Sequence, residues 1–549
     1  MALTIKAGTR PPWVGLAAAV WVQLGSGNPY TFPLYSPTLK SVLGYSQQQI
    51  TMLGVAVDIG ESAGILPGMA CNRFPPWAVL FVGALCCFCG YGLIWLSVTE
   101  TVHNLPYWLL WCAHLAAANS SAWFSTTVIV TNMRNFPLNR GTVAGLMKGY
   151  SALAAGIFTE IYSMVLNKSS STLLLFLTIG LPIICFAMMT LVRLCAPATA
   201  SEDTSQNFLF VQIAGVVLGV FLLSTQVLDS TITLGKPVCY SFIAIMVVLM
   251  LAPLAIPVKM TLLPSEKIVD ISTSESEPLL PSKSSQNILD EKENGVLQES
   301  ESDPNLLLAV GEGAVEMKKR RPRRGEDFTF RQAMVKADFW LLWLVYFLGS
   351  GSGVTVVNNL SQIGYSQGNG NDTTMLLSLF SFCFFVGRLG GGAIPEYFVS
   401  SKAIPRTIWM SFTQVIMLAS FLLYASNLHG THYIATGLIG MSYGVQFTTM
   451  IPTSSELFGL KNFGVIFNFM MLANPVGALL FSGWLAGSVY DAEATRQGVS
   501  ACFGPDCFRF TFLVLAAACG IGASLGLLLT VRIRPVYQML YSSGSFRVH

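Results

Sequence analysis

Residues 77–98 read WAVLFVGALCCFCGYGLIWLSV and contain no charged side chain. A helix needs about 20 apolar residues to cross the hydrocarbon core of a bilayer, so this stretch is long enough to span a membrane. Fourteen apolar runs of this kind occur, at residues 13–36, 48–71, 77–98, 106–131, 143–166, 172–194, 208–228, 238–258, 338–361, 373–395, 405–425, 432–452, 463–487 and 508–531. The sequence therefore predicts an all-α membrane protein.

The composition excludes a soluble protein. Of 549 residues, 53% are apolar and only 11% are charged, against about 25% charged residues in soluble domains. The net charge of +3 is too small to predict binding to nucleic acid. The cysteines are scattered, mostly inside apolar runs, and are interpreted as small buried hydrophobic residues. Without a Walker lysine loop or an H-E-x-x-H motif, we predict neither an ATP-driven pump nor an enzyme, and no metal site or cofactor.

The charged residues gather in one polar insert. Residues 259–337 hold 12 of the 31 Lys and Arg and 14 of the 28 Asp and Glu, a composition that predicts a disordered loop. Two strings in it, at 275–280 and 303–308, resemble acidic dileucine signals, so sorting adaptors are candidate partners. The predicted organisation is a six-helix bundle at 1–195, an extra helix pair at 196–258, this loop, a second six-helix bundle at 338–531, and a tail at 532–549. The count is fourteen spans, or twelve if the extra pair does not cross.

The short loops set the expected orientation. With a cytosolic N-terminus, twelve Lys and Arg lie in short cytosolic segments and five lie on the opposite side, so the positive-inside rule places both termini in the cytosol. The sequons at Asn167 and Asn371 then fall in outer loops as glycosylation candidates. Cys502 and Cys507 share the last outer loop and are candidates for a disulfide. The expected location is the plasma membrane or a vacuolar or endosomal membrane.

A weak internal repeat relates the two halves. The stretch 23–28, QLGSGN, is echoed by LGSGSG at 348–353, and GYSQ occurs at both 44–47 and 364–367. Both echoes have an offset of about 320 residues, which indicates a duplicated six-span unit in parallel orientation. The alternative is chance similarity between spans rich in Gly and Ser.

Long strings carry a family resemblance. Residues 21–47, 132–150 and 467–477 resemble the plant nodulin-like major facilitator proteins of the "nuclear fusion defective"-like group. The resemblance implies a secondary transporter with two six-helix bundles that rock around a central cavity. Related branches carry monocarboxylates, oxalate and formate, so a small organic anion is an expected solute.

Four titratable side chains inside the runs are candidates for proton coupling. Asp58 and Glu61 lie near mid-membrane, one helical turn apart on the same face. A carboxylate at the bilayer centre costs roughly 2.5–3.5 kcal/mol, so this pair needs a partner, water or protons. The alternative role is a structural lock between helices. His114 and Glu160 are weaker candidates, because a lone His is more often a packing residue and Glu160 is expected to face water near the outer end of its span.

A conformational latch is implied by resemblance to the major facilitator signature G-R-x-x-G-x-x-x-D. Gly387 and Arg388 match its start, and Glu396, the first acid after them, is taken as the counterpart of the Asp. The signature is expected at the cytosolic end of the tenth span. The corresponding site in the first half keeps Arg73 but has no acid, which puts a second latch in doubt.

Polar residues inside the runs predict a path for a small-molecule solute. Proline breaks the helical hydrogen-bond ladder next to Asn28 and Asn474, and the freed carbonyl groups then line a cavity or bind side chains. The candidates are Asn28, Tyr30, Asn119, Tyr443, Gln446, Asn468 and Asn474. The alternative for each is hydrogen bonding between helices without ligand contact.

Basic side chains for binding an anion are scarce in the apolar runs. Lys148 is expected to extend to the cytosol, which leaves no deep cation outside the signature and disfavours a dicarboxylate or phosphate substrate. The sequence thus favours a secondary carrier of a small polar solute in the lipid bilayer. A non-transporting receptor or scaffold of the same fold is the alternative.

Overall fold

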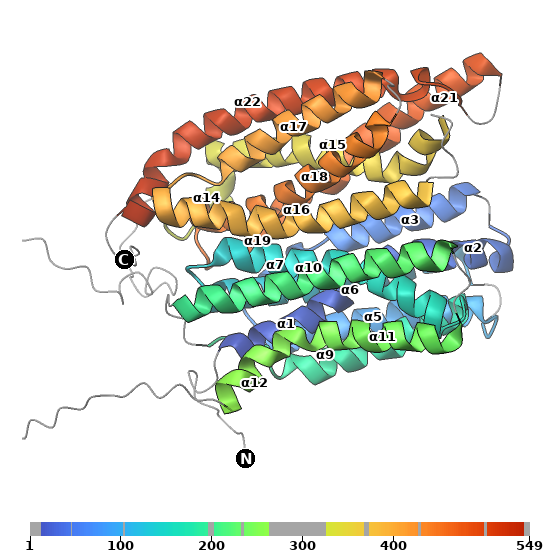
Figure 1. Cartoon of the computed structure of the whole chain (residues 1–549), viewed down its shortest axis with the longest axis horizontal. Helices are drawn as coiled ribbons and strands as arrows, with labels where there is room; N and C mark the ends of the chain where they lie inside the picture. The colour runs from blue at the N-terminus through green and yellow to red at the C-terminus, as the bar shows by residue number, and fades with distance from the viewer. Residues whose placement is uncertain are drawn as a thin grey trace, which may run out of the picture.

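The computed structural model describes residues 12–542 except 46, 103–104, 196–201, 232–234, 263–324, 367–372, 427–429 and 499–501. All regular structure in these residues is helical, so the predicted all-α class is confirmed. The helices lie side by side along one common direction (Figure 1). Helix α1 begins and α22 ends at the same end of the bundle, which we call the termini end; the opposite end is the far end.

The N-terminal half contains six helical segments, several of them interrupted. They are α1 (Pro12–Gly25), η1 (Asn28–Thr31) and α2 (Phe32–Leu43); α3 (Gln47–Ser62) and α4 (Ile65–Ala70); α5 (Pro76–Val98); α6 (Tyr107–Asn135); α7 (Arg140–Glu160) and η2 (Ile161–Val165); and α8 (Ser170–Leu175), η3 (Phe176–Gly180) and α9 (Leu181–Met189). Two further segments follow: α10 (Glu202–Thr231), and α11 (Lys236–Leu251) with η4 (Ala252–Leu254) and α12 (Ala255–Leu262).

The C-terminal half repeats the pattern of six segments. It begins with the short α14 (Phe330–Met334), which has a capping box between Thr329 and Gln332. The segments are α15 (Ala337–Ser366); α16 (Thr373–Lys402); α17 (Thr407–Ser426); α18 (Thr431–Phe458); α19 (Phe463–Met471), α20 (Ala473–Gly477), η6 (Ala478–Ala486) and α21 (Gly487–Gln497); and α22 (Asp506–Ser542). Each of the fourteen apolar runs coincides with one of these segments.

Eight segments are long and apolar enough to cross a membrane by themselves. The others are the broken segments α1–α2 and α3–α4 and the more polar helices α6, α7, α16 and α18. Several polar side chains on these helices, among them Arg388 and Gln446, are buried between helices, which accommodates their lower hydropathy. The chain is therefore a multi-pass membrane protein, and the number of crossings, fourteen or twelve, stays a prediction.

Glycine ridges bring the two halves together. Gly141, Gly145 and Gly149 repeat every four residues along α7, and a Cβ on Gly145 would lie 2.8 Å from the Cα of Gly392 in α16. Small residues at this spacing let helix backbones approach closely. A Cβ on Gly68 of α4 would likewise meet the Gly464 carbonyl group of α19. These close approaches lie in the termini half of the molecule.

The long loop lies outside the described residues over 263–324. The dileucine-like strings, and with them the predicted sorting function, fall in this range. The sequon Asn371 falls in a second gap, at 367–372. The domain boundaries at 195, 258, 337 and 531 stay predictions.

Candidate functional site

A cluster of charged side chains lies between the halves. The Tyr30 hydroxyl group of η1 donates to Glu61 Oε1 at 3.2 Å. The Arg388 guanidinium from α16 lies within electrostatic range of the same hydroxyl group, and Glu61 lies within electrostatic range of both Arg388 and Lys148. Lys148, Arg388 and Glu61 therefore share a single site, with Arg388 supplied by the opposite half.

Arg388 does not lie where the signature predicts. Helix α16 continues about two turns past the apolar run, through Pro395 to Lys402, so Arg388 falls near its middle rather than at its cytosolic end. The Arg388 side chain is buried, and Nη1 donates to the Lys148 carbonyl oxygen at 2.8 Å and to Ser151 Oγ at 3.2 Å. Its guanidinium carbon stacks 3.9 Å from the centre of the Phe384 ring. The Nε atom is buried without a hydrogen-bond partner in the described structure.

Lys148 also differs from its predicted position. The sequence predicts that this side chain extends to the cytosol, but Nζ donates to Ser125 Oγ at 3.0 Å and lies 5.8 Å from the centre of the Phe467 ring. The apolar run fixed the depth of Lys148 but not the face of α7 on which it lies. The expectation that no deep cation accompanies Arg388 is therefore wrong, and with it the argument against a strongly anionic substrate.

Of the proton-coupling candidates, only Asp58 and Glu61 belong to this site. Asp58 is solvent-exposed and lies within electrostatic range of Glu61. His114 is buried at the far end of α6, where Nδ1 contacts the Leu110 carbonyl oxygen at 2.8 Å and the ring packs against Tyr35. Glu160 is buried as well, rather than facing water.

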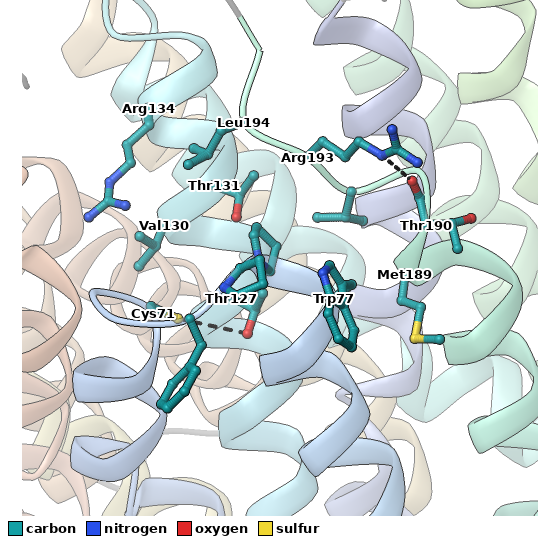
Figure 2. A pocket seen from close by; sticks show the side chains of 14 residues that line it. Cys71, Trp77, Thr127, Val130, Thr131, Arg134, Met189, Thr190, Arg193 and Leu194 are labelled. Atoms are coloured by element: carbon teal, nitrogen blue, oxygen red, sulfur yellow. Dashed lines mark hydrogen bonds between the residues drawn. The ribbon is translucent and has the colours of Figure 1, made fainter. Parts of the chain in front are cut away.

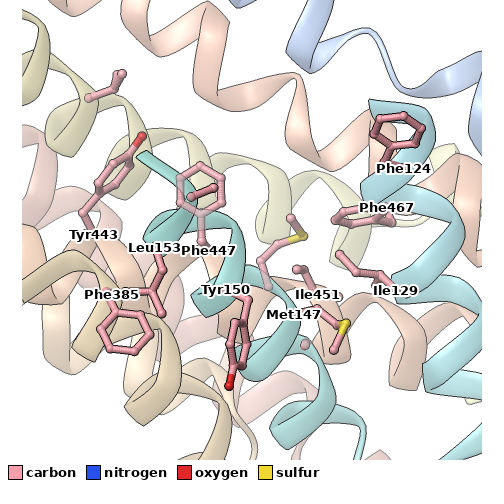
Figure 3. Close-up of a cluster of buried hydrophobic side chains, with 14 of the residues drawn as sticks. Phe124, Ile129, Met147, Tyr150, Leu153, Phe385, Tyr443, Phe447, Ile451 and Phe467 are labelled. Carbon is pink, nitrogen blue, oxygen red and sulfur yellow. The ribbon is translucent and has the colours of Figure 1, made fainter. Parts of the chain in front are cut away.

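Two of the path candidates continue the site into the C-terminal half. The Tyr443 hydroxyl group donates to Asn474 Oδ1 at 3.0 Å, and the Tyr443 ring stacks on Phe384 at 4.7 Å between ring centres. Phe384 therefore joins Tyr443 to Arg388. Figure 3 shows Tyr443 and Phe447 beside the apolar side chains of α7.

The amides of four path candidates hold helices together. Asn28 donates to Ser120 Oγ at 3.0 Å and accepts from Tyr91. Asn119 donates to the Gly60 and Ala63 carbonyl oxygens. Gln446 donates to the Met410 carbonyl oxygen and to Thr413 Oγ1. Asn468 of α19 donates to Thr126 Oγ1 of α6 at 3.0 Å and therefore links the two halves.

An ionic cluster occupies the termini end of the C-terminal half. Arg406 Nη2 lies 3.1 Å from Glu396 Oε2 and 2.8 Å from Glu456 Oε1, and all three side chains are buried. Glu396 also accepts from the backbone N–H of Gly141 in α7, and Glu456 accepts from the Tyr537 hydroxyl group. Arg406, not Arg388, is therefore the partner of Glu396.

The remaining candidates contribute no side chain to the site. Gly387 packs against the Met441 carbonyl group, and Arg73 is exposed. Asn167 is exposed in a far-end loop with φ 49°. Cys502 and Cys507 form a disulfide.

Figure 2 shows a pocket of about 620 Å³ at the termini end of the N-terminal half, lined by Trp77, Thr127 and Leu194 with Arg134 and Arg193 at its rims. Arg193 Nε donates to the Thr190 carbonyl oxygen at 2.6 Å. No carboxylate lines this pocket, and it lies apart from the charged cluster.

Two short motifs lie in structural settings that do not suit the chemistry they are known for. Residues 440–444 match the G-x-S-x-G spacing of hydrolases, but they lie inside the continuous helix α18, whereas that motif needs a strand-to-helix turn. Cys86 and Cys89 have C-x-x-C spacing on α5, yet the described residues contain no group of three or more His, Cys, Asp or Glu side chains placed to hold a metal ion.

Sequence reasoning missed Lys148, Arg406 and Glu456. For Lys148 a signal was present, since it lies between Gly145 and Gly149 on the glycine-rich face of α7. For Arg406 and Glu456 there was little signal, because each lies at a helix end, where charged residues are ordinary.

The fold is that of major facilitator superfamily transporters. The structure of the proton:xylose symporter XylE bound to 6-bromo-6-deoxy-D-glucose aligns with a TM-score of 0.53 at 10% identity, covering 95% of this chain and 94% of XylE. Probable transporter mch1 of Emericella nidulans is 21% identical, over 90% of this chain and 82% of that protein.

The sequence defines the family more narrowly. The Nodulin-like profile matches residues 12–258, and the profile of the NFD4 C-terminal domain matches residues 326–539. Protein NUCLEAR FUSION DEFECTIVE 4 of Arabidopsis thaliana is 31% identical, over 96% of this chain and 90% of that protein. The chain belongs to the Nodulin-like family, as the strings at 21–47, 132–150 and 467–477 indicate.

Proposed function

We propose that the protein is a secondary active carrier of a small organic anion and that transport is coupled to protons. The observation that supports this most is the position of Lys148 and Arg388 beside Glu61, at the junction of the two halves. Asp58 also belongs to this site, so a proton on Glu61 leaves two cations and one carboxylate, a net positive charge that suits a monovalent anion.

Glu61 couples proton binding to anion binding. With Glu61 ionised, its carboxylate competes with the solute for both cations. A proton on Glu61 removes that competition, so a carboxylate solute binds Lys148 and Arg388 through charge-assisted hydrogen bonds. Anion affinity therefore rises as pH falls, and proton and anion move together. Asp58, exposed beside Glu61, is the entry point for the proton.

The positions of the contacts between the halves support alternating access. The close approaches at Gly68 and Gly145 and the hydrogen bond from Asn468 to Thr126 lie on the termini side of the site, while Tyr30 remains 37% exposed. This arrangement is a state closed at the termini end. Rocking of the halves would separate the glycine ridges and open that end.

The termini end is proposed to face the cytosol. The Cys502–Cys507 disulfide and the exposed sequon at Asn167 lie at the far end, and both features suit an oxidising, glycosylating compartment. The membrane is the plasma membrane or a vacuolar or endosomal one.

Uptake into proteoliposomes tests the carrier. Small monocarboxylates, dicarboxylates, amino acids and sugars are offered with and without an inward proton gradient, and we expect only anions to accumulate. Lys148→Gln should weaken anion binding at least about tenfold, or about 1.4 kcal/mol, as measured by the shift in melting temperature on adding the solute. If no solute accumulates and none shifts the melting temperature, the receptor or scaffold alternative replaces the carrier.

Glu61→Gln tests the coupling. This variant should keep anion exchange but lose accumulation driven by the gradient, and its anion affinity should no longer depend on pH. Asp58→Asn should slow gradient-driven uptake while leaving that affinity pH-dependent. Gradient-driven accumulation that persists in Glu61→Gln would contradict the assignment.

A further inference from the structure

Glu160 is a buried carboxylate that the central site does not use. It ends α7 at the far end, its side chain is only 1% exposed, and neither carboxylate oxygen has a hydrogen-bond partner in the described structure. An ionised carboxylate in such surroundings is strongly disfavoured unless it is paired. The side chain therefore needs a proton or a counter-charge.

The first of the two extra segments, α10, covers Glu160. Gln226 Nε2 donates to the Gly156 carbonyl oxygen of α7 at 3.3 Å, and a Cβ on Gly156 would lie 3.4 Å from Leu222 Cδ1. Thr225 is buried beside Glu160, and its hydroxyl group donates to the Phe221 and Leu222 carbonyl oxygens. The contact between α7 and α10 is thus tight at Gly156, one turn before the carboxylate.

The charged group that faces Glu160 is a second carboxylate. Asp229, one turn beyond Thr225 on α10, is half-buried and lies within electrostatic range. From η2, the Tyr162 hydroxyl group is bonded to the Lys168 carbonyl oxygen, and Lys236 at the start of α11 is exposed. Among the described residues, no basic side chain compensates Glu160.

The helix changes its hydrogen-bond pattern at this point. Residues Ile161–Val165 directly after Glu160 form a π-helix, a rare conformation that is frequent at functional sites. Helix α11 packs against this π-helix. Both extra segments therefore meet the N-terminal half at Glu160.

Helix α10 also touches the C-terminal half. The Tyr150 hydroxyl group of α7 donates to the Val211 carbonyl oxygen of α10 at 3.4 Å, and a Cβ on Gly219 of α10 would lie 2.9 Å from Phe385 Cε1 of α16. Figure 3 shows Tyr150, Leu153 and Phe385 in one apolar cluster. A shift of α10 would therefore disturb contacts with both halves. One of these contacts is at Phe385, one turn from Arg388.

We propose that Glu160 and Asp229 form a proton-binding site, separate from the central cluster, in which one shared proton holds α10 against α7. Two facing carboxylates at low solvent exposure do not both ionise readily. The shared proton makes an O–H···O bond between the helices. When the shared proton is lost, the two negative charges repel and α10 moves away from α7. The contact between α10 and α16 is then broken.

Infrared difference spectroscopy on the purified full chain tests the proton directly. At neutral pH we expect a carbonyl band of a protonated carboxylic acid that disappears in Glu160→Gln and weakens in Asp229→Asn. The matched control is Glu493→Gln, which removes a carboxylate paired with Arg496 on the surface and should leave the band unchanged. If wild type and Glu160→Gln give the same carboxylic acid bands, the proposal is overturned.

Pulsed electron paramagnetic resonance tests the consequence. Spin labels at the exposed positions Val220 on α10 and Ile179 on η3, in a chain whose free cysteines are replaced, report the separation of α10 from the N-terminal half. The separation should increase with rising pH in the wild type and stay short at all pH values in Glu160→Gln. The proposal is contradicted if the distance between the labels is independent of pH in the wild type, or if it changes equally with pH in Glu160→Gln.

Discussion

Arg406 shows at the residue scale how a buried charge is tolerated. Its guanidinium lies between Glu396 and Glu456, which are themselves bonded to Gly141 and Tyr537. Each carboxylate therefore has at least two donors. Because Glu396 also accepts from Gly141 in the opposite half, the cluster connects the internal packing of the C-terminal half to the contact between the halves.

Arg406→Ala should be severely destabilising, because it leaves two buried carboxylates without their cation. Breaking a buried ion pair by removing one partner costs about 3–5 kcal/mol, and we expect a loss of that size in thermal or denaturant unfolding. Arg496→Ala is the matched control. It removes a surface pair with Glu493 whose Arg side chain is 71% exposed, and such pairs contribute about 0–1 kcal/mol. Equal losses in both variants would contradict the role of Arg406.

At the scale of elements, the contact between α7 and α16 depends on glycine. Gly141 and Gly145 face Gly392, and the backbones touch. Larger side chains would hold the helices apart at the end that the ionic cluster closes. The same face of α7 carries Lys148, so the contact that closes the molecule also positions one cation of the site.

Gly145→Ala should therefore shift the population toward opening at the termini end. The new Cβ would lie 2.8 Å from the Arg388 carbonyl oxygen, and overpacking of this kind costs about 1–3 kcal/mol. Spin-label distances across the termini end should lengthen. Gly487→Ala is the control, since the Cβ there would meet only Ser482 at 3.9 Å. Unchanged distances in Gly145→Ala would show that the ridge does not control closure.

For the whole molecule, the proposed state is open at the far end and closed at the termini end. Asp58 and Tyr30 are exposed, whereas Asn468 is buried between the halves. In a chain whose ten free cysteines are replaced, a charged thiol reagent added at the far end should modify Asp58→Cys. The same reagent should modify Asn468→Cys more slowly from either end. Faster labelling of Asn468→Cys from the termini end would identify the opposite state as the resting one.

The sequence by itself determined the fold class, the positions of the helical segments and the family, because apolar length and long motif strings are local properties. It also selected Glu61, Arg388 and Glu396 as candidates, and their roles stay predictions. It could not place them, since α16 continues past the apolar run and moves Arg388 from the helix end to its middle.

Only the tertiary structure decided which charges meet. Lys148 turns inward because of the face of α7 on which it lies, Glu396 pairs with Arg406 from the next helix, and Glu160 is buried because α10 folds over it. Depth in the membrane follows from counting residues along one helix. Which charged side chains pair depends on the rotation of each helix about its axis and on contacts between segments that lie far apart in the chain. No local sequence pattern encodes either of these.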